Sequence, residues 1–168
     1  MEIPKKSLKR IALLQMNSSS IQEENFNFIS KMVSLASQNY SQMLFLPENF
    51  NYMKTNDSSK AEFENLEGPT IQKYKDLANK YKIWLSLGGY QEKIENSKKI
   101  YNSHIIIDDA GEIRSIYRKL HLFDIDVDEN NRMRESATVQ CGKEIIDPIE
   151  SPIGKIGELT LSYFTFNC

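Results

Sequence analysis

MLFL at residues 43–46, followed directly by Pro47 and Glu48, is the stretch that decides the fold. Four consecutive apolar residues that stop at a proline are typical of a short strand buried on both faces of a sheet. A second apolar run, IWLSLGG at 83–89, predicts another strand that ends in two glycines. The segment LKRIALLQM at 8–16 predicts a strand that precedes both. Three such strands indicate a sheet at the centre of the fold.

Two segments between these strands have the spacing of amphipathic helices. In IQEENFNFISKMVSLASQ at 21–38, apolar residues recur at near-helical intervals, and the serines at 18–20 offer N-cap oxygens. IQKYKDLANKYK at 71–82 places its apolar residues on one face, while the polar stretch 51–68 predicts a loop. Strand, helix, strand, helix, strand is the order of an α/β layered fold.

The second half of the chain predicts a hairpin, an irregular stretch and a final strand. IYNSHIIID at 100–108 and EIRSIYRK at 112–119 predict two strands joined by a turn at 109–111. Residues 120–143 have no regular pattern, and the segment 154–166 begins as another strand. Because an apolar sheet face needs a covering layer, a final strand with no helix after it predicts part of a larger domain.

Composition excludes several classes of protein. The chain has 168 residues, with 21 Lys and Arg against 23 Asp and Glu, and a formal net charge of -2. This balance gives no electrostatic reason to expect a nucleic-acid partner. No apolar run approaches the roughly 20 residues of a membrane span, and IALLQM is too short for a signal-peptide core. Two cysteines cannot make a disulfide scaffold. We therefore expect a cytoplasmic protein without nucleic-acid or membrane partners.

Two charged residues stand at the ends of predicted strands, where α/β sheets bind their ligands. Glu48 follows the strand at 43–46, and a carboxylate at that place can act as a general base. The alternative is a solvated acid in a surface loop. Lys119 ends the strand at 112–119 and can hold an oxyanion. Most lysines are simply solvated, and the neighbouring Arg118 is an equal candidate for the exposed position.

The sequence does not predict a calcium site. Asp124, Asp126, Asp128 and Glu135 match positions 1, 3, 5 and 12 of a calcium-binding loop. Glu129, however, replaces the glycine that the loop needs for its turn, and no flanking helices are predicted.

The histidines and cysteines do not predict a metal centre. His104 and His121 have no partner at zinc-ligand spacing, and His104 is expected to be a satisfied core residue because it lies among isoleucines. Cys141 stands in a polar loop with no local base, and Cys168 is the last residue of the sequence. Neither is expected to be a nucleophile, because a nucleophile needs a fixed backbone and an oriented base. No cofactor is predicted.

Six blocks, taken in their order and spacing, resemble the carbon–nitrogen hydrolase (nitrilase) superfamily and, within it, the Nit amidases that act on deaminated glutathione. These are FLPENF (45–50), WLSLGGYQEK (84–93), KIYNSHIIIDDAGEI (99–113), YRKLHLFDID (117–126), RMRES (132–136) and ESPIGKIG (150–157).

The resemblance implies the N-terminal portion of a four-layer α-β-β-α sandwich and a Glu-Lys-Cys triad with a second glutamate. Glu48 then resembles the general base, Lys119 the residue that stabilises the tetrahedral intermediate, and Glu135 the second glutamate, which helps to position substrate and lysine. The implied reaction is hydrolysis of a small-molecule amide through a thioester, without metal or organic cofactor. The full-length family domain is implied to form a homodimer.

The likeness stops near residue 157. The family continues after GKIG with an apolar strand and Cys-Tyr-Asp, whereas this chain reads ELTLSYFTFNC, in which Cys168 comes about six residues too late. We therefore predict a hydrolase domain at 8–157, represented by its N-terminal part, and an atypical tail at 158–168. The alternative is a shortened, non-catalytic relative that acts as a binding or regulatory fragment, or an incomplete gene model.

Overall fold

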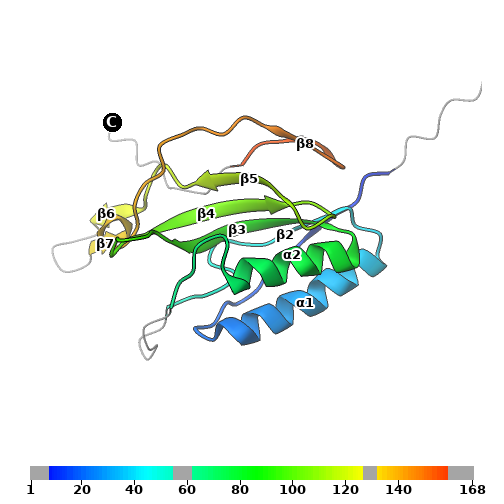
Figure 1. Ribbon diagram of the computed structural model, residues 1–168, viewed down its shortest axis with the longest axis horizontal. Coiled ribbons are helices and arrows are strands. Elements are labelled where there is room, and N and C mark those ends of the chain that lie inside the picture. The colour runs from blue at the N-terminus through cyan, green and yellow to red at the C-terminus, as the bar shows by residue number, and fades with distance from the viewer. Residues whose placement is uncertain (1–7, 55–61, 127–131, 159–168) are drawn as a thin grey trace, which may run out of the picture.

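The computed structural model describes residues 8–54, 62–126 and 132–158. A five-stranded sheet in the order β1-β2-β3-β4-β5 forms its centre, and two helices cover one face of it (Figure 1). These elements are β1 (Ile11–Leu13), α1 (Gln22–Gln38), β2 (Met43–Phe45), α2 (Pro69–Tyr81), β3 (Trp84–Lys93), β4 (Ile100–Ile107) and β5 (Ile113–Arg118). The α/β class predicted from the alternating pattern is therefore confirmed.

The sheet is mixed. β1, β2 and β3 run parallel, with Leu44 opposite Leu85, and each of the two crossovers contains one helix. β4 and β5 are antiparallel additions at one edge. Their turn is held by Asp108, whose Oδ1 accepts hydrogen bonds from Ala110 N and Glu112 N, both at 2.9 Å. Gly111 has a φ of 84°, a value that favours glycine. The predicted hairpin is confirmed.

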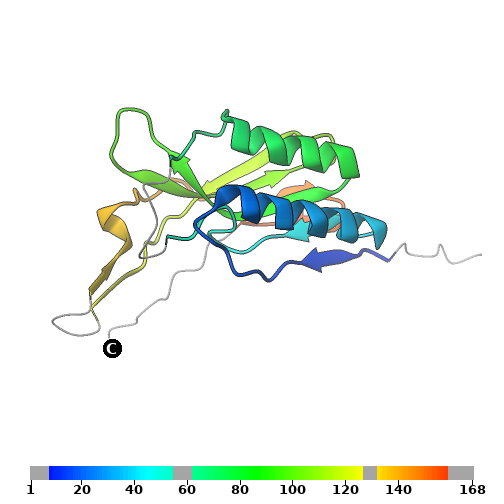
Figure 2. The ribbon, with the colours of Figure 1, turned by 90° about the horizontal axis from the view of Figure 1, so that it is seen from below.

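The main core lies between the helices and the sheet. The helices lie side by side on the sheet (Figure 2), and each contributes a buried apolar stripe, as their periodicity predicts. The fully buried side chains of this core include Ile29 and Val33 of α1, Ile71 and Tyr74 of α2, and Leu85, Leu87, Ile105 and Ile107 of the sheet. Burying such side chains is the main force that holds the layers together.

The opposite face of the sheet carries a smaller cluster. Met43, Trp84 and Ile106 are buried there against a hairpin of β8 (Ile149–Ser151) and β9 (Gly154–Ile156). This segment crosses over the sheet on the side away from the helices (Figure 1). The strand MLF is therefore covered on both faces, as its unbroken apolar run predicts.

Several sequence-based boundaries are wrong. β3 does not end at the glycines but continues through Gly88 and Gly89 to Lys93, with a shift in register between Leu87 and Tyr90. The serines do not cap α1, whose N-cap residue is Ile21. Ser19 Oγ instead accepts a hydrogen bond from Ile21 N at 3.1 Å, one residue before the helix.

The stretch 120–143, predicted to be irregular, contains regular pieces. β6 (Asp124–Asp126) pairs with β7 (Arg132–Arg134), and a 3-10 helix follows at Glu135–Ala137. These elements are three residues long, too short to leave a periodic signal. The strand predicted from residue 154 begins as β9, but its continuation from 159 lies outside the described residues, as does most of the predicted tail.

Candidate active site

Glu48 is placed by the C-terminal end of β2. Leu46 N donates to Ser86 O at 2.8 Å, so the chain still runs beside β3 after the strand has ended. Glu48 then forms an isolated parallel bridge with Gly89. The absence of a side chain at Gly89 matters here, because a Cβ would lie 2.8 Å from Glu48 Cγ. Glu48 is therefore accommodated at the glycines where the sequence pattern predicts the end of the strand.

Lys119 directly follows β5 and is held through its main chain on both sides. Its N–H donates to Asn102 O at 2.9 Å, and its carbonyl accepts a hydrogen bond from Gly142 N at 2.9 Å. The Lys119 side chain is 3% exposed, whereas that of Arg118 is 41% exposed. Of the two adjacent cations, Arg118 is thus the more exposed one, and Lys119 is directed into the molecule.

Glu135 is the first residue of the 3-10 helix that follows β7. Its N–H donates to Phe123 O at 3.1 Å, and its Oε2 accepts a hydrogen bond from Phe123 N at 2.6 Å. The short β6–β7 pair therefore sets the position of this carboxylate.

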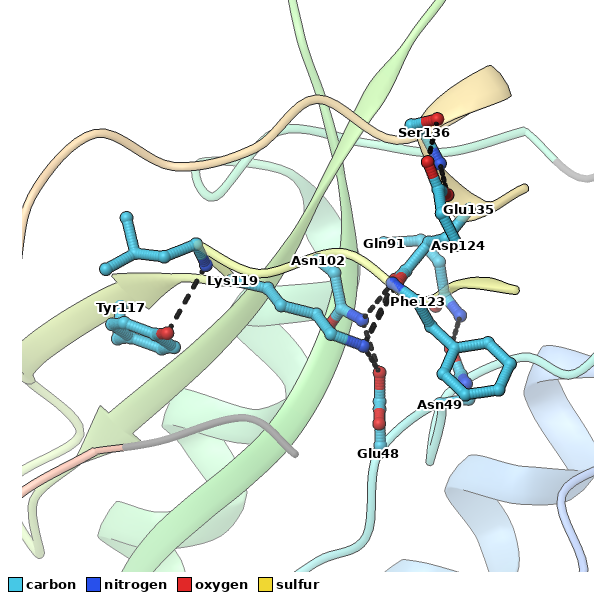
Figure 3. A network of polar contacts seen from close by, with 11 residues as sticks. Glu48, Asn49, Gln91, Asn102, Tyr117, Lys119, Phe123, Asp124, Glu135 and Ser136 are labelled. Atoms are coloured by element: carbon cyan, nitrogen blue, oxygen red, sulfur yellow. Dashed lines mark hydrogen bonds and ion pairs between the residues drawn. The ribbon is translucent and has the colours of Figure 1, made fainter. Parts of the chain in front are cut away.

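The structure brings all three predicted site residues together (Figure 3). Lys119 Nζ lies 3.0 Å from Glu48 Oε1 and 3.0 Å from Glu135 Oε2. It also lies 3.3 Å from Glu135 Oε1. One buried ammonium group is thus bound by two carboxylates that are 31% and 17% exposed. A buried lysine bound in this way cannot be the solvated residue of the alternative reading.

Asn102 is a member of this cluster that sequence reasoning missed. Its Nδ2 donates to Glu48 Oε1 at 2.5 Å and to Glu135 Oε1 at 3.3 Å. In the sequence it is one polar residue in a strand, and its two carboxylate partners are 54 and 33 positions away.

These side chains line a pocket of about 520 Å³. The residues around it are Glu48, Asn49, Gln91, Ile100, Asn102, Lys119, Phe123, Arg134, Glu135 and Val139. Ammonium and amide groups can donate hydrogen bonds here, and carboxylates can accept a proton. A pocket that combines these groups with apolar walls is suited to proton transfer and to stabilising a developing negative charge.

A second ion pair supports the same strands from the other side. Arg118 binds Glu92 with two hydrogen bonds, from Nη2 to Oε1 at 2.6 Å and from Nε to Oε2 at 2.8 Å, and Ser103 Oγ donates to Glu92 Oε2 at 2.6 Å. The bound Glu92 raises the pKa of Arg118 above its usual value. The guanidinium also lies 4.6 Å from the centre of the Tyr101 ring. These contacts join β3, β4 and β5 next to Lys119.

The rejected calcium ligands have protein partners. Asp124 Oδ2 accepts a hydrogen bond from Ser136 Oγ at 2.6 Å, and Asp126 pairs with Arg134 at 2.6 Å. The hydrogen bonds from Ser136 hold the pKa of Asp124 below its usual value. Asp128 and Glu129 lie outside the described residues. Within the described ranges, no three His, Cys, Asp or Glu side chains are grouped to hold a metal ion.

His104 is only partly the satisfied core residue that the sequence predicts. Its Nε2 lies 2.7 Å from Ser86 Oγ, but Nδ1 is buried without a hydrogen-bond partner. Burial lowers the pKa of His104 to about 4.

Cys141 is exposed, and Cys168 lies outside the described residues. In the part of the chain that is described, neither helix has the length and apolar character that crossing a bilayer would require.

Residues 10–160 match the family model of the carbon-nitrogen hydrolases. The chain is 40% identical over 164 residues to the deaminated glutathione amidase of Dictyostelium discoideum, an alignment that covers 93% of this chain and 56% of that protein. Among solved structures it resembles the NitFhit protein of C. elegans, with a TM-score of 0.78, 33% identity, and coverage of 90% of this chain and 38% of that one. Nit3 of Saccharomyces cerevisiae, described as a member of branch 10 of the nitrilase superfamily, gives a TM-score of 0.71 at 29% identity, covering 89% of this chain and 54% of that one.

The chain thus spans about half the length of the Dictyostelium amidase that it matches. The structural neighbours confirm the predicted fold class, the N-terminal portion of a nitrilase-like sandwich. The described residues include two helices and a five-stranded sheet of this fold. Taken with the match over residues 10–160, this shows that the chain belongs to the carbon-nitrogen hydrolase family.

Proposed function

We propose that this chain supplies the acid–base and oxyanion-binding part of an amidase that hydrolyses the carbon–nitrogen bond of a small-molecule amide. The observation that carries the proposal is the ion cluster in the pocket, where the 3% exposed Lys119 lies 3.0 Å from both Glu48 and Glu135. Two carboxylates around one buried lysine at the wall of a pocket are typical of functional sites.

Each residue has a defined role in this reaction. Glu48 takes the proton of a thiol nucleophile, and the thiolate attacks the amide carbon. Lys119 stabilises the oxyanion of the tetrahedral intermediate. Glu48 returns the proton to the leaving nitrogen, which departs as ammonia or an amine and leaves a thioester. Water, activated by the same carboxylate, then hydrolyses the thioester. Glu135 keeps Lys119 in place through the contact at 3.0 Å.

The nucleophile has to come from outside this cluster. Cys141 is exposed and is not among the residues that line the pocket. A serine in its place would be a far weaker nucleophile, because its hydroxyl is much less ionised than a thiol near neutral pH. Because neither Cys141 nor Cys168 is expected to act, we assign the thiol to a cysteine in the part of the family domain that this sequence does not span.

Deaminated glutathione is the substrate that we favour, because the Dictyostelium relative is named for acting on it. The pocket of about 520 Å³ is large enough for such a small, peptide-like amide. The homodimer, the cytoplasmic location and the absence of a nucleic-acid partner stay predictions.

Two experiments test the proposal. The first titrates the isotope-labelled chain with deaminated glutathione and follows the backbone and side-chain NMR signals of Asn102, Lys119 and Phe123. We expect the shifts at Asn102 and Phe123 to be abolished by Lys119→Met. Lys143→Met, a change of an exposed lysine outside this pocket, is expected to leave the shifts at all three residues intact. A titration without shifts at the pocket contradicts the proposal.

The second experiment joins residues 8–157 to the part of the Dictyostelium amidase that lies beyond the aligned region, and measures ammonia release. We expect Glu48→Gln to lower the rate roughly 10²–10⁴-fold, and Lys119→Met roughly 10²–10³-fold. An active fusion that tolerates both changes would rule out these roles. If the fusion is inactive, the binding titration alone decides.

A further inference from the structure

Asn102, near the start of β4, forms a hydrogen bond with each of the three charged residues of the cluster. Its Nδ2 donates to Glu48 Oε1 at 2.5 Å and to Glu135 Oε1 at 3.3 Å. Its carbonyl oxygen accepts the main-chain hydrogen bond from Lys119 at 2.9 Å. The three charged residues come from three different segments of the chain, and the side-chain amide of Asn102 lies beside both glutamates (Figure 3).

The side chain of Asn102 duplicates the contacts of Lys119. Lys119 Nζ donates to Glu48 Oε1 at 3.0 Å and to Glu135 Oε1 at 3.3 Å, the same two oxygens that Asn102 Nδ2 reaches. One ammonium group cannot neutralise two carboxylates, which repel each other. A neutral donor that binds both oxygens reduces this repulsion without adding a second positive charge.

The orientation of the Asn102 amide is determined by its surroundings. The residue is 6% exposed. A reversed amide would place its oxygen against two carboxylate oxygens, so Nδ2 is the atom that faces them. Oδ1 is buried on the side of Gly89, where a Cβ would come within 2.8 Å of it. The amide is therefore fixed between the backbone of β3 and the carboxylates.

The two carboxylates depend on Asn102 to different degrees. Glu135 is also held by Phe123 N, which donates to its Oε2 at 2.6 Å. Among the described residues, the Glu48 carboxylate is bound by Asn102 and Lys119, both through Oε1. We propose that Asn102 is a positioning residue that holds Glu48 Oε1 against Lys119 and so leaves Oε2 of Glu48 for proton transfer.

The role of Glu48 as a base rests on the proposed function, but the positioning is tested without catalysis. Scalar couplings across hydrogen bonds, from Lys119 Nζ to the side-chain carboxyl carbons, are measured by NMR on the full labelled chain. The unchanged chain is expected to show couplings to both Glu48 and Glu135. In Asn102→Leu, which keeps the volume and loses the donor, the coupling to Glu48 is expected to disappear while the coupling to Glu135 persists. Loss of both couplings, or of neither, is what a merely structural side chain would give, and either result overturns the proposal.

A second variant covers the case in which Asn102→Leu does not fold. Asn102→Asp has the same shape, and its ionised carboxylate repels Glu48, whereas its protonated form can donate to Glu48 Oε1. We expect the Lys119–Glu48 coupling to be absent at neutral pH and to return on acidification, at a pH above the ordinary range for an aspartate because two carboxylates are nearby. A coupling that does not change with pH contradicts the proposal.

A matched control is available on the neighbouring strand. Gln91 lies opposite Asn102 in the β3–β4 register and is also buried, but its amide donates to Asn49 Oδ1 and Tyr52 O rather than to a carboxylate. Gln91→Leu is expected to keep both couplings. If the couplings behave as expected but no amide is bound or hydrolysed, the proposed function fails and the positioning role stands. If an amide is bound or hydrolysed but the couplings do not change as expected, the positioning role fails and the proposed function stands.

Discussion

Gly89 and Glu48 approach each other so closely that a single methyl group would separate them. A Cβ at Gly89 would lie 2.8 Å from Glu48 Cγ and 3.2 Å from Glu48 Cα. The same atom would lie 2.8 Å from Asn102 Oδ1. The backbone of β3 is thus the wall against which both the carboxylate and its amide partner rest.

Gly89→Ala is therefore expected to displace Glu48 and to destabilise the fold. Real Cβ atoms do not approach neighbours to 2.8 Å, so β3 or the Glu48 segment must shift. We expect the free energy of unfolding to fall by about 1–3 kcal/mol, the usual cost of overpacking. Denaturant unfolding measures this, with Gly157→Ala as the control, because a Cβ there would lie 3.8 Å from Pro148 Cγ. Equal stability of the two variants would contradict the close approach.

Most of the fold could be predicted from local patterns, because its main elements each leave a periodic signal. α1 and α2 show helical spacing, and the run at 43–46 is buried on both faces as expected. The continuation of β3 through two glycines could not be predicted, because glycine ordinarily weakens a strand. Here the glycines remain in the strand because the chain around Glu48 packs against them.

The site was predictable only in part, because it also depends on contacts between segments that are far apart in the sequence. Glu48 and Lys119 follow strands, which made them candidates, but 71 positions separate them in the sequence. Glu135 could be predicted as a site residue only from the family resemblance. Its position depends on the β6–β7 pair, whose strands are too short to leave a periodic signal in the sequence. Asn102 has no signal at all in a single sequence, because its role depends on what the folded chain places around its amide.

Removal of the buried ammonium group is expected to destabilise the fold. Lys119→Met keeps the length of the side chain but leaves two adjacent carboxylates without a cation. Breaking a buried pair costs about 3–5 kcal/mol; we expect about 2–3 kcal/mol, because Glu48 is 31% exposed and water can solvate it in part. The control is Lys73→Met, which breaks the exposed pair with Glu23 and should cost under about 1 kcal/mol. Denaturant midpoints at pH 7 compare the two, and similar losses would argue against the buried cluster.

Glu158 is expected to make the fold less stable as the pH rises. Burial raises its pKa to about 7 from 4.5, although a hydrogen bond from Ser115 opposes the shift. Between these values the folded state binds more protons than the unfolded state, so the free energy of unfolding falls with increasing pH. Glu158→Gln should therefore stabilise the chain at pH 8 by about 1 kcal/mol, a value discounted because solvent screens a partly exposed group. The exposed Glu150→Gln serves as the control, and unfolding at pH 5 and pH 8 gives the comparison. A stabilisation that is the same at both pH values would exclude titration of Glu158 as its cause.

His104 is expected to have the opposite effect, at lower pH. Burial lowers its pKa from 6.5 to about 4, and its Nδ1 has no partner that could stabilise a proton. Between pH 6.5 and 4 the unfolded state binds the proton and the folded state does not, so the free energy of unfolding falls as the pH falls, by about 3 kcal/mol at the limit. His104→Gln should remove this slope, whereas the exposed His121→Gln should retain it. Denaturant unfolding in steps from pH 7 to pH 4 measures the slopes. An unchanged slope in His104→Gln would mean that other groups cause the acid sensitivity and that folding does not lower the pKa of His104.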